Sequence, residues 1–413
     1  MIKFEKYKLK NGLKVILHQD LSTPMAVVNT LYDVGARDEN EDKTGFAHLF
    51  EHLMFGGSAH IESFDKELQK AGGESNAFTS NDITNYYEII PAQNIQTALW
   101  LESDRMLSLA FTDKSLEVQK NVVIEEFKQR YLNQPYGDVW LNLRPLAYEQ
   151  HPYRWATIGK DISHIENATI QDVKSFFKKF YTPSNAILCI SGKFDSDSVK
   201  EQIELYFGSI PGGLKPARHF PAEPHQNEFK SKSIKRDVPA NAFYYAFKMS
   251  TRKSTAYYLG DLFSDAIGKD SSSILNIKLK KELELVSEIN AFITGSLDEG
   301  LFIIGGKLSE NTSFDTLDKA LWKEIESIKK KGFGKSKLNA LKNKISTAKA
   351  FQDQGLLNRS MNLCYFELLG DANGINEEEA IYQSIEHGDL LSFAEQILVK
   401  TNCSLLKVHQ NAG

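Results

Sequence analysis

Hydrophobic and polar residues alternate at the start of the chain, and this alternation predicts β-strands. Residues 7–10 and 13–17 alternate on either side of Asn11-Gly12, a dipeptide that favours a type I′ turn. We therefore expect a β-hairpin there, followed by a strand over residues 26–34.

Hydrophobic positions then recur every three or four residues, which is typical of amphipathic helices. Paired glycines at positions 56–57 and 72–73 interrupt this pattern, and we expect helices to end there. The predicted helices are residues 44–55, 63–71, 92–109 and 113–132, and the predicted strands between them are residues 76–79 and 84–90.

One spaced pattern occurs in both halves of the chain. It reads Asp-x-x-Ser-Phe, with an Asn thirteen residues after the Asp and an apolar segment after that Asn, and it occupies residues 172–185 and 389–402. The two copies are 217 residues apart, about half the chain. We interpret them as the trace of a duplication that produced two homologous domains.

The length of 413 residues also favours two domains over a single core. Residues 210–239 are rich in Pro, Gly, Lys and His and lack periodicity, as expected of a linker. We predict a first, catalytic domain over residues 1–215, a linker over 216–238 and a homologous second domain over 239–413.

Composition narrows the function classes. The chain is 41% hydrophobic and 25% charged with a net charge of −5, which is ordinary for a soluble globular protein and gives no basic footprint for nucleic acid. No segment approaches the roughly 18 apolar residues of a membrane span, and the charged start of the chain does not resemble a signal peptide. We expect a cytoplasmic protein, or a periplasmic one if a leader has been removed. The three cysteines are far apart, so neither a disulfide framework nor a thiolate metal site is expected.

The strongest chemical signal is a His-x-x-Glu-His motif formed by His48, Glu51 and His52. A helix turns about 100° per residue, so these three side chains share one face and both imidazoles can bind one metal ion. They could instead form a solvated helix face, but the surrounding residues are mostly apolar, and two His and a Glu on a buried helix are costly without a ligand. The duplication offset places Asp265 and Lys269 at the equivalent positions, so we expect no second metal motif.

A catalytic zinc ion bound by two His needs a third protein ligand, and a carboxylate is expected. The best source is the predicted helix that contains the apolar run 122–124 followed by Glu125 and Glu126. The spacing alone does not choose between these two glutamates.

With these residues the chain resembles the pitrilysin and insulysin-type inverzincin peptidases, in particular the short two-domain members similar to mitochondrial processing peptidase subunits. The resemblance extends beyond the zinc motif to the opening hairpin at 9–13, to the segments 72–80 and 84–87, and to later landmarks at 151–153, 158–159 and 181–186. It covers essentially the whole first half and, more weakly, the second.

The resemblance implies an α+β fold, in which each domain is a mostly antiparallel sheet covered by helices and the chain forms half of a clam-shell dimer around a chamber. It implies one Zn²⁺ per chain, with Glu126 as the third ligand, and Glu51 activating a zinc-bound water to cleave unfolded peptides. It also implies that the peptide adds as a strand to an edge formed by Asn76, Ala77, Phe78 and Thr79.

The chain departs from the family pattern in two places. Gln119 stands where the family often has an acid one heptad before the distal Glu. Lys280 and Ser287 stand where active assemblies carry an Arg and a Tyr that bind the substrate backbone. The second departure favours a heterodimer in which a homologous chain without zinc supplies the Arg and Tyr, with a homodimer as the alternative.

Two other functions are compatible with the sequence. The chain could be a structural or assembly subunit without proteolytic activity, although proteins of that kind have typically lost metal residues that this chain keeps. A non-proteolytic metallohydrolase could use the same helix motif, but the segment Asn76–Thr79 favours a peptide substrate.

Overall fold

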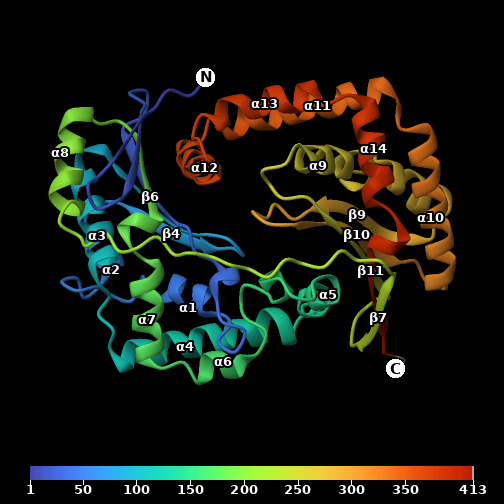
Figure 1. Ribbon diagram of the computed structural model, residues 1–413, viewed down its shortest axis with the longest axis horizontal. Helices are drawn as coiled ribbons and strands as arrows, with labels where there is room; N and C mark the ends of the chain where they lie inside the picture. The colour runs from blue at the N-terminus through green and yellow to red at the C-terminus, as the bar shows by residue number, and fades with distance from the viewer. Residues whose placement is uncertain (412–413) are drawn as a thin grey trace. The chain divides into compact units, whose positions relative to one another are not determined.

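The computed structural model describes residues 1–411, which fold into two compact units (Figure 1). Unit 1 is formed by Met1–Lys128, Trp155–Phe220 and Ala350–Glu377. Unit 2 is formed by Gln129–Arg154, Pro221–Lys349 and the chain from Glu378 onward. Each unit therefore combines segments from both halves of the sequence, whereas the domains predicted from the sequence are contiguous.

Unit 1 is built on a six-stranded sheet with the order β1-β2-β6-β3-β5-β4. All neighbouring strands are antiparallel except β2 and β6. The predicted opening hairpin is confirmed, since β1 and β2 pair from Glu5↔Leu17 to Lys8↔Lys14. The strands are β1 (Glu5–Lys8), β2 (Lys14–Gln19), β3 (Met25–Tyr32), β4 (Glu74–Thr79), β5 (Thr84–Pro91) and β6 (Ala186–Gly192).

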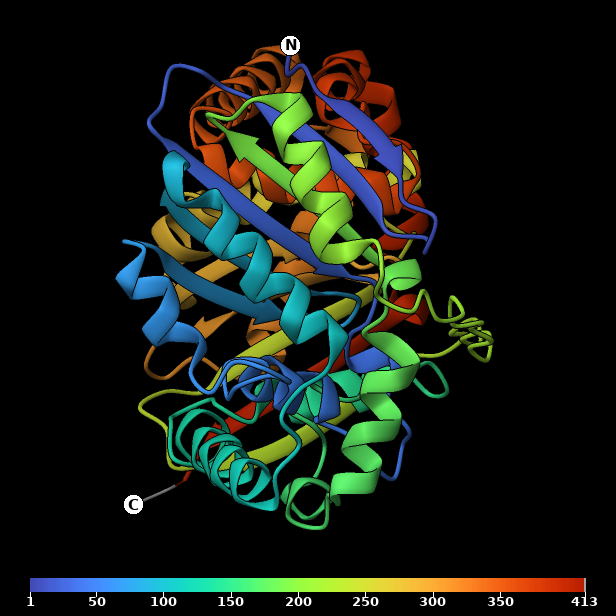
Figure 2. The same ribbon diagram turned by 90° about the vertical axis from the view of Figure 1, so that its left-hand side faces the viewer.

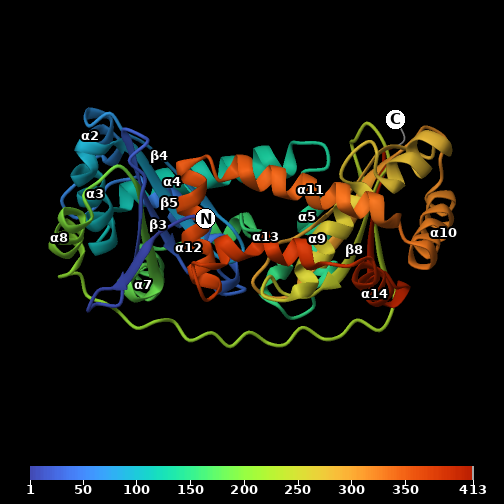
Figure 3. The ribbon, with the colours of Figure 1, turned by 90° about the horizontal axis from the view of Figure 1, so that it is seen from above.

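Helices cover both faces of this sheet. On one face lie α3 (Ile95–Leu107) and α8 (Ser196–Phe207), seen in front of the strands in Figure 2. On the other face lies α12 (Leu356–Leu369), which packs against β3 and β6 (Figure 3). The other α-helices of the unit are α1 (Phe46–Leu53), α2 (Phe64–Lys70), α4 (Asp113–Phe127), α6 (Ile162–Glu166) and α7 (Ile170–Phe180).

Unit 2 repeats this plan with a five-stranded sheet of order β7-β11-β8-β10-β9, in which only β7 and β11 are parallel. Helices α9 (Thr255–Gly268) and α14 (His387–Ile397) pack on one face and α5 (Val139–Ala147) on the other. The strands are β7 (Lys230–Arg236), β8 (Ala242–Met249), β9 (Val286–Ile293), β10 (Gly300–Leu308) and β11 (Cys403–Gln410), and the remaining α-helices are α10 (Phe314–Lys331), α11 (Gly334–Gln352) and α13 (Gly374–Ser384).

The two copies of the repeated pattern have the same structural role. The amide of Asn185 donates hydrogen bonds of 2.9 Å to the carbonyl oxygens of Asp33 and Phe180. The amide of Asn402 donates bonds of 2.9 Å to the carbonyl oxygens of Lys248 and Ile397. Each Asn thus ties the end of a helix to the neighbouring strand or the turn that follows it, and the predicted fold class of two homologous α+β domains is confirmed.

Each sheet receives one helix that sequence reasoning assigns to the other half. Helix α12 completes unit 1, where its Leu363 and Cys364 are fully buried together with Ile16 and Cys189. Helix α5 completes unit 2, where its Leu143 is fully buried together with residues of β8, β10 and β11. Of the predicted linker, residues 216–227 form neither helix nor strand, while Lys230–Arg236 forms β7.

None of the helices described in the structure combines the length and the apolar character needed to cross a bilayer.

Candidate metal centre

The start of α1 is fixed by the backbone of Gly45. This residue has φ of +88°, and a Cβ at this position would lie 2.7 Å from the carbonyl oxygen of Ile158. Only glycine combines this conformation with so close a backbone neighbour. The preceding Thr44 accepts a hydrogen bond of 2.9 Å from the backbone N–H of Lys160. The first turn of α1 is therefore held against the segment around residues 158–160.

A buried carboxylate outside the helix completes this arrangement. Glu39 accepts hydrogen bonds from the backbone N–H of Gly45 (2.9 Å) and of Ala47 (2.8 Å). The N–H groups of a first helical turn have no partner within the helix, and a negative charge there is favoured by the helix dipole. Burial raises the pKa of Glu39, and the two backbone N–H donors act in the opposite direction.

Helix α1 separates apolar and polar side chains onto opposite faces. Its buried residues are Phe46, Ala47, Leu49, Phe50 and Leu53, and the ring of Phe50 stacks on Tyr181 with centroids 4.9 Å apart. His48, Glu51 and His52 are partly exposed on the other face. The phase of the helix predicted from the sequence is thus confirmed.

Glu125 and Glu126 have different surroundings in the structure. Glu125 is exposed and forms an ion pair of 2.7 Å with Lys128. Glu126 instead points toward α1, against which α4 packs. Helix α4 is less buried than its apolar run suggests, because Val122 is 44% exposed while Val123 and Ile124 are buried.

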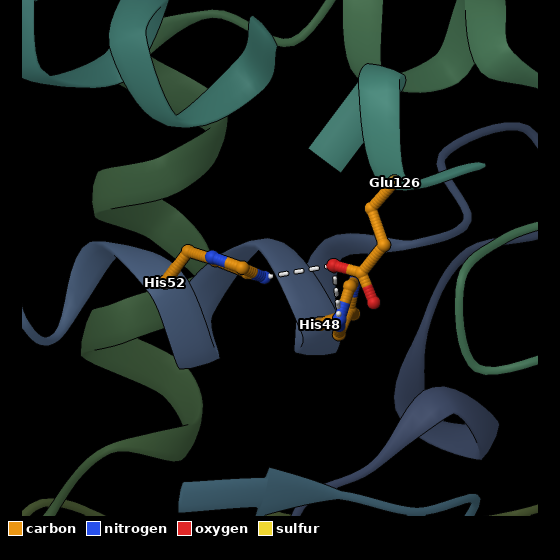
Figure 4. Close-up of side chains that lie close together, drawn as sticks. All are labelled: His48, His52 and Glu126. Carbon is orange, nitrogen blue, oxygen red and sulfur yellow. Dashed lines mark ion pairs between the residues drawn. The ribbon is translucent and has the colours of Figure 1, made fainter. Parts of the chain in front are cut away.

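Three potential ligand atoms converge at this place (Figure 4). One carboxylate oxygen of Glu126, Oε2, lies 3.5 Å from His48 Nε2 and 3.3 Å from His52 Nε2. Ligand atoms about 2.0–2.2 Å from a common ion in tetrahedral geometry are separated by roughly 3.3–3.6 Å. The buried His52 Nε2 makes no hydrogen bond within the described residues. The spacing, the donor set and this unsatisfied nitrogen all fit a zinc ion.

Glu51 belongs to the same face but does not join this group. It faces β4, against which α1 packs, at Thr79. Burial raises the pKa of Glu51, whereas the polar groups of Thr79 and the nearby His52 lower it. The carboxyl of Glu51 therefore lies near His52 and Glu126 without being one of the three converging groups.

The predicted substrate strand is the free edge of the unit 1 sheet. Asn76, Ala77, Phe78 and Thr79 lie on β4, which pairs with β5 on one side only. Side chains on β4 alternate between exposed and partly buried, and Phe78 is 39% exposed. The backbone N–H of Ala77 donates a hydrogen bond of 2.8 Å to the side-chain oxygen of Asn76. This bond occupies a backbone donor that an added strand would otherwise use for pairing.

The equivalent place in unit 2 has different chemistry. Asp265 and Lys269, at the positions that correspond to the two His, form an ion pair of 2.8 Å at the end of α9. Lys280 and Ser287, at the positions where the resemblance predicts an Arg and a Tyr, are exposed near β9. Within residues 1–411, His48, His52 and Glu126 are the one group of such side chains close enough to share a metal ion.

Sequence reasoning did not identify Glu39. No periodicity points to it, because it lies outside the helix that it caps and the chain between them makes a loop. The sequence offers only an indirect signal for Glu39, because it is an acidic residue that shortly precedes a glycine at the start of a helix.

The chain is similar to known peptidases over both halves. The model of the insulinase family, peptidase family M16, matches residues 14–158, and that of the peptidase M16 inactive domain matches residues 167–345. Zinc protease PqqE of Helicobacter pylori is 32% identical over 348 residues, which cover 82% of this chain and 78% of that protein. The chain belongs to peptidase family M16. The predicted family is thereby confirmed.

Other M16 relatives place this chain among the short members. A probable mitochondrial-processing peptidase subunit beta of Arabidopsis thaliana is 24% identical over 78% of this chain and 62% of its own. The crystal structure of a protease from Helicobacter pylori matches with a TM-score of 0.92 and 27% identity, covering 99% of this chain and 100% of that one. Pitrilysin matches with a TM-score of 0.77 and 16% identity, and this chain covers 45% of it.

The role of Glu39 leads to a stability prediction. Glu39→Ala leaves two buried N–H groups without acceptors, and a buried unsatisfied group costs about 1–3 kcal/mol. We expect a lower midpoint in urea unfolding, followed by circular dichroism. The matched control is Glu41→Ala, which removes an exposed ion pair with Lys160 that contributes at most about 1 kcal/mol. Equal unfolding midpoints for the two variants would show that Glu39 does not hold α1.

Proposed function

We propose that this M16 protein is a zinc-dependent endopeptidase that acts on unfolded peptides. The observation that carries the proposal is the convergence of His48, His52 and Glu126 beside a carboxyl that is not one of them, Glu51. Two His and one Glu form the ligand set of catalytic zinc sites in several peptidases. The names of the relatives, zinc proteases among them, support the same conclusion.

His48, His52 and Glu126 would hold the zinc ion. When bound, zinc supplies a Lewis acid that polarises a carbonyl oxygen and makes a water molecule more acidic. The attachment of α1 at Gly45 and Glu39 fixes the backbone from which both imidazoles project.

Glu51 would move the proton. Its carboxylate accepts a proton from the attacking water and then donates it to the amine of the leaving peptide segment. Burial raises the pKa of Glu51, and Thr79 and His52 oppose this rise only in part. A raised pKa favours a carboxyl that holds the proton between the two steps.

The edge of β4 would bind the substrate backbone. An extended peptide that adds beside β4 forms main-chain hydrogen bonds and alternates its side chains, which gives affinity with little dependence on sequence. The Asn76 side chain would have to release the N–H of Ala77 for this. Because Thr79 faces Glu51, a peptide on this edge lies next to the proposed catalytic group. Folded proteins lack a segment that is free to add beside β4, so we expect unfolded peptides to be cleaved. We propose that this cleavage takes place in a closed chamber.

A structural subunit remains the alternative function. The family model that matches residues 167–345 describes an inactive domain, and unit 2 has no metal group of its own among the described residues. The two functions differ in a measurable way, because a purely structural subunit has no use for Glu51.

The proposal predicts the effect of Glu51→Gln. The variant should bind as much zinc as the wild type and lose peptidase activity by at least about 10²–10⁴-fold, the usual contribution of a general base. The zinc content is measured by elemental analysis. The peptidase activity is measured as turnover of an unfolded peptide. Glu166→Gln, an exposed change at the end of α6 and outside the proposed site, serves as the control. An active Glu51→Gln protein would refute the assignment of this base.

We further propose that a second, homologous chain completes the active assembly. Lys280 keeps a positive charge but lacks the planar fork with which Arg binds a carbonyl or carboxylate, and Ser287 is too short to replace a Tyr. A partner without zinc that carries the Arg and Tyr would supply both groups. The resemblance to mitochondrial-processing peptidase beta subunits supports pairing of this kind.

The pairing proposal predicts a difference between isolated and mixed chains. Peptidase activity of the purified chain should be low and should rise at least about tenfold when a homologous M16 chain that carries the Arg and Tyr is added. Size-exclusion chromatography should show the two chains together. Full activity of the isolated chain as a homodimer, unchanged by such a partner, would contradict the heterodimer.

A further inference from the structure

A cavity of about 780 Å³ lies within unit 1, away from the metal-binding face of α1. Its volume is in the range of small-molecule sites, about 300–1,000 Å³. It is bounded by the end of α3, the turn that follows α3, the second half of α7 and residues 210–217. The apolar part of its wall includes Met106, Leu107, Phe111, Phe177, Ile210 and Leu214.

The cavity is separated from the metal centre by α1. Phe177 and Tyr181 line it, and both rings stack on Phe50 of α1, with centroids 6.4 and 4.9 Å away. Phe50 is on the buried face of α1, opposite His48 and His52. A ligand in the cavity would therefore not reach the proposed zinc ligands.

The charge around the cavity has one sign. Lys174, Lys178, Lys179 and Lys215 are exposed at its rim, and no Asp or Glu contributes to its lining. Of the four, only Lys215 lies within ion-pair distance of a carboxylate in the described residues, 3.7 Å from Asp33. Lysines in the last turn of a helix also complement its dipole, which accounts for Lys178 and Lys179. It does not account for Lys174, near the middle of α7, or for Lys215, which is outside that helix.

The mouth of the cavity exposes large apolar side chains. Leu214 is 89% exposed and Leu107 is 43% exposed. Burial of apolar side chains of this size is favourable, so a ligand that covers them gains affinity. The lining offers few directional polar groups besides the hydroxyls of Ser108 and Thr182, which disfavours a nucleotide or a sugar.

We propose that this cavity binds a single-chain anionic amphiphile, with the aliphatic chain against the apolar wall and the anionic head among the four lysines. A long-chain carboxylate has this chemistry. Charge complementarity selects an anionic head, and the apolar wall selects an aliphatic chain. The ligand binds from solution and not as part of a bilayer. This inference does not depend on zinc binding or on peptidase activity.

The test is isothermal titration calorimetry of the full-length chain with dodecanoate below its micellar concentration. We expect one site per chain, with dodecanol, the uncharged analogue, bound at least about tenfold more weakly. Lys174→Glu with Lys178→Glu should weaken dodecanoate binding by a similar factor. The matched control reverses two exposed lysines at the end of α10, Lys330→Glu with Lys331→Glu, and should leave binding unchanged.

A second cavity variant tests the proposal even if the double lysine variant does not fold. Leu214 is almost fully exposed, so Leu214→Asp has little effect on the fold but removes an apolar contact and adds repulsion at the mouth. It should also weaken dodecanoate binding. Equal affinity for dodecanoate and dodecanol, or unchanged affinity in both cavity variants, would overturn the proposal. The proposal would also be overturned if the protein sedimented with anionic phospholipid vesicles but did not bind free dodecanoate.

Discussion

Helix α1 must bury one face completely while it presents two imidazoles and a carboxyl on the other, and it has only eight residues in which to do so. A helix this short is not stable alone and depends on tertiary contacts. The contacts come from three directions: the Phe50 ring stack on Tyr181, the backbone approach at Gly45, and the carboxylate of Glu39 at the first turn. With α1 fixed, His48 and His52 have a defined position, and α4 needs only to bring Glu126 within reach.

The two units share a fold and differ in chemistry. The equivalent Asn185 and Asn402 make equivalent bonds, so the repeated sequence pattern preserves the architecture. By the offset of 217 residues, the positions of the two His correspond to Asp265 and Lys269, which form an ion pair with each other. The shared fold therefore does not by itself require a metal site.

Local features were predictable from the sequence, and features that depend on distant contacts were not. The hairpin, the phase of α1 and a strand at Asn76–Thr79 follow from alternation, helical spacing and turn residues. The place of that strand at a sheet edge was expected only from the family resemblance. The choice between Glu125 and Glu126 did not follow, since adjacent positions differ by about 100° around a helix and both adjoin the same apolar run. The placement of α5 and α12 could not be predicted either, because an amphipathic pattern shows which face is buried but not which sheet buries it. Glu39 was missed for the same reason, as its partners lie across a loop.

The most direct test of the account is the zinc content of two neighbouring substitutions, Glu126→Gln and Glu125→Gln, compared with the wild type after dialysis against a weak chelator. Both remove one negative charge from the same turn of α4, and only Glu126 approaches the two His. The account predicts about one zinc per chain in the wild type and in Glu125→Gln, and a large loss of zinc in Glu126→Gln. Equal zinc content in all three proteins, or no zinc in the wild type, would contradict it.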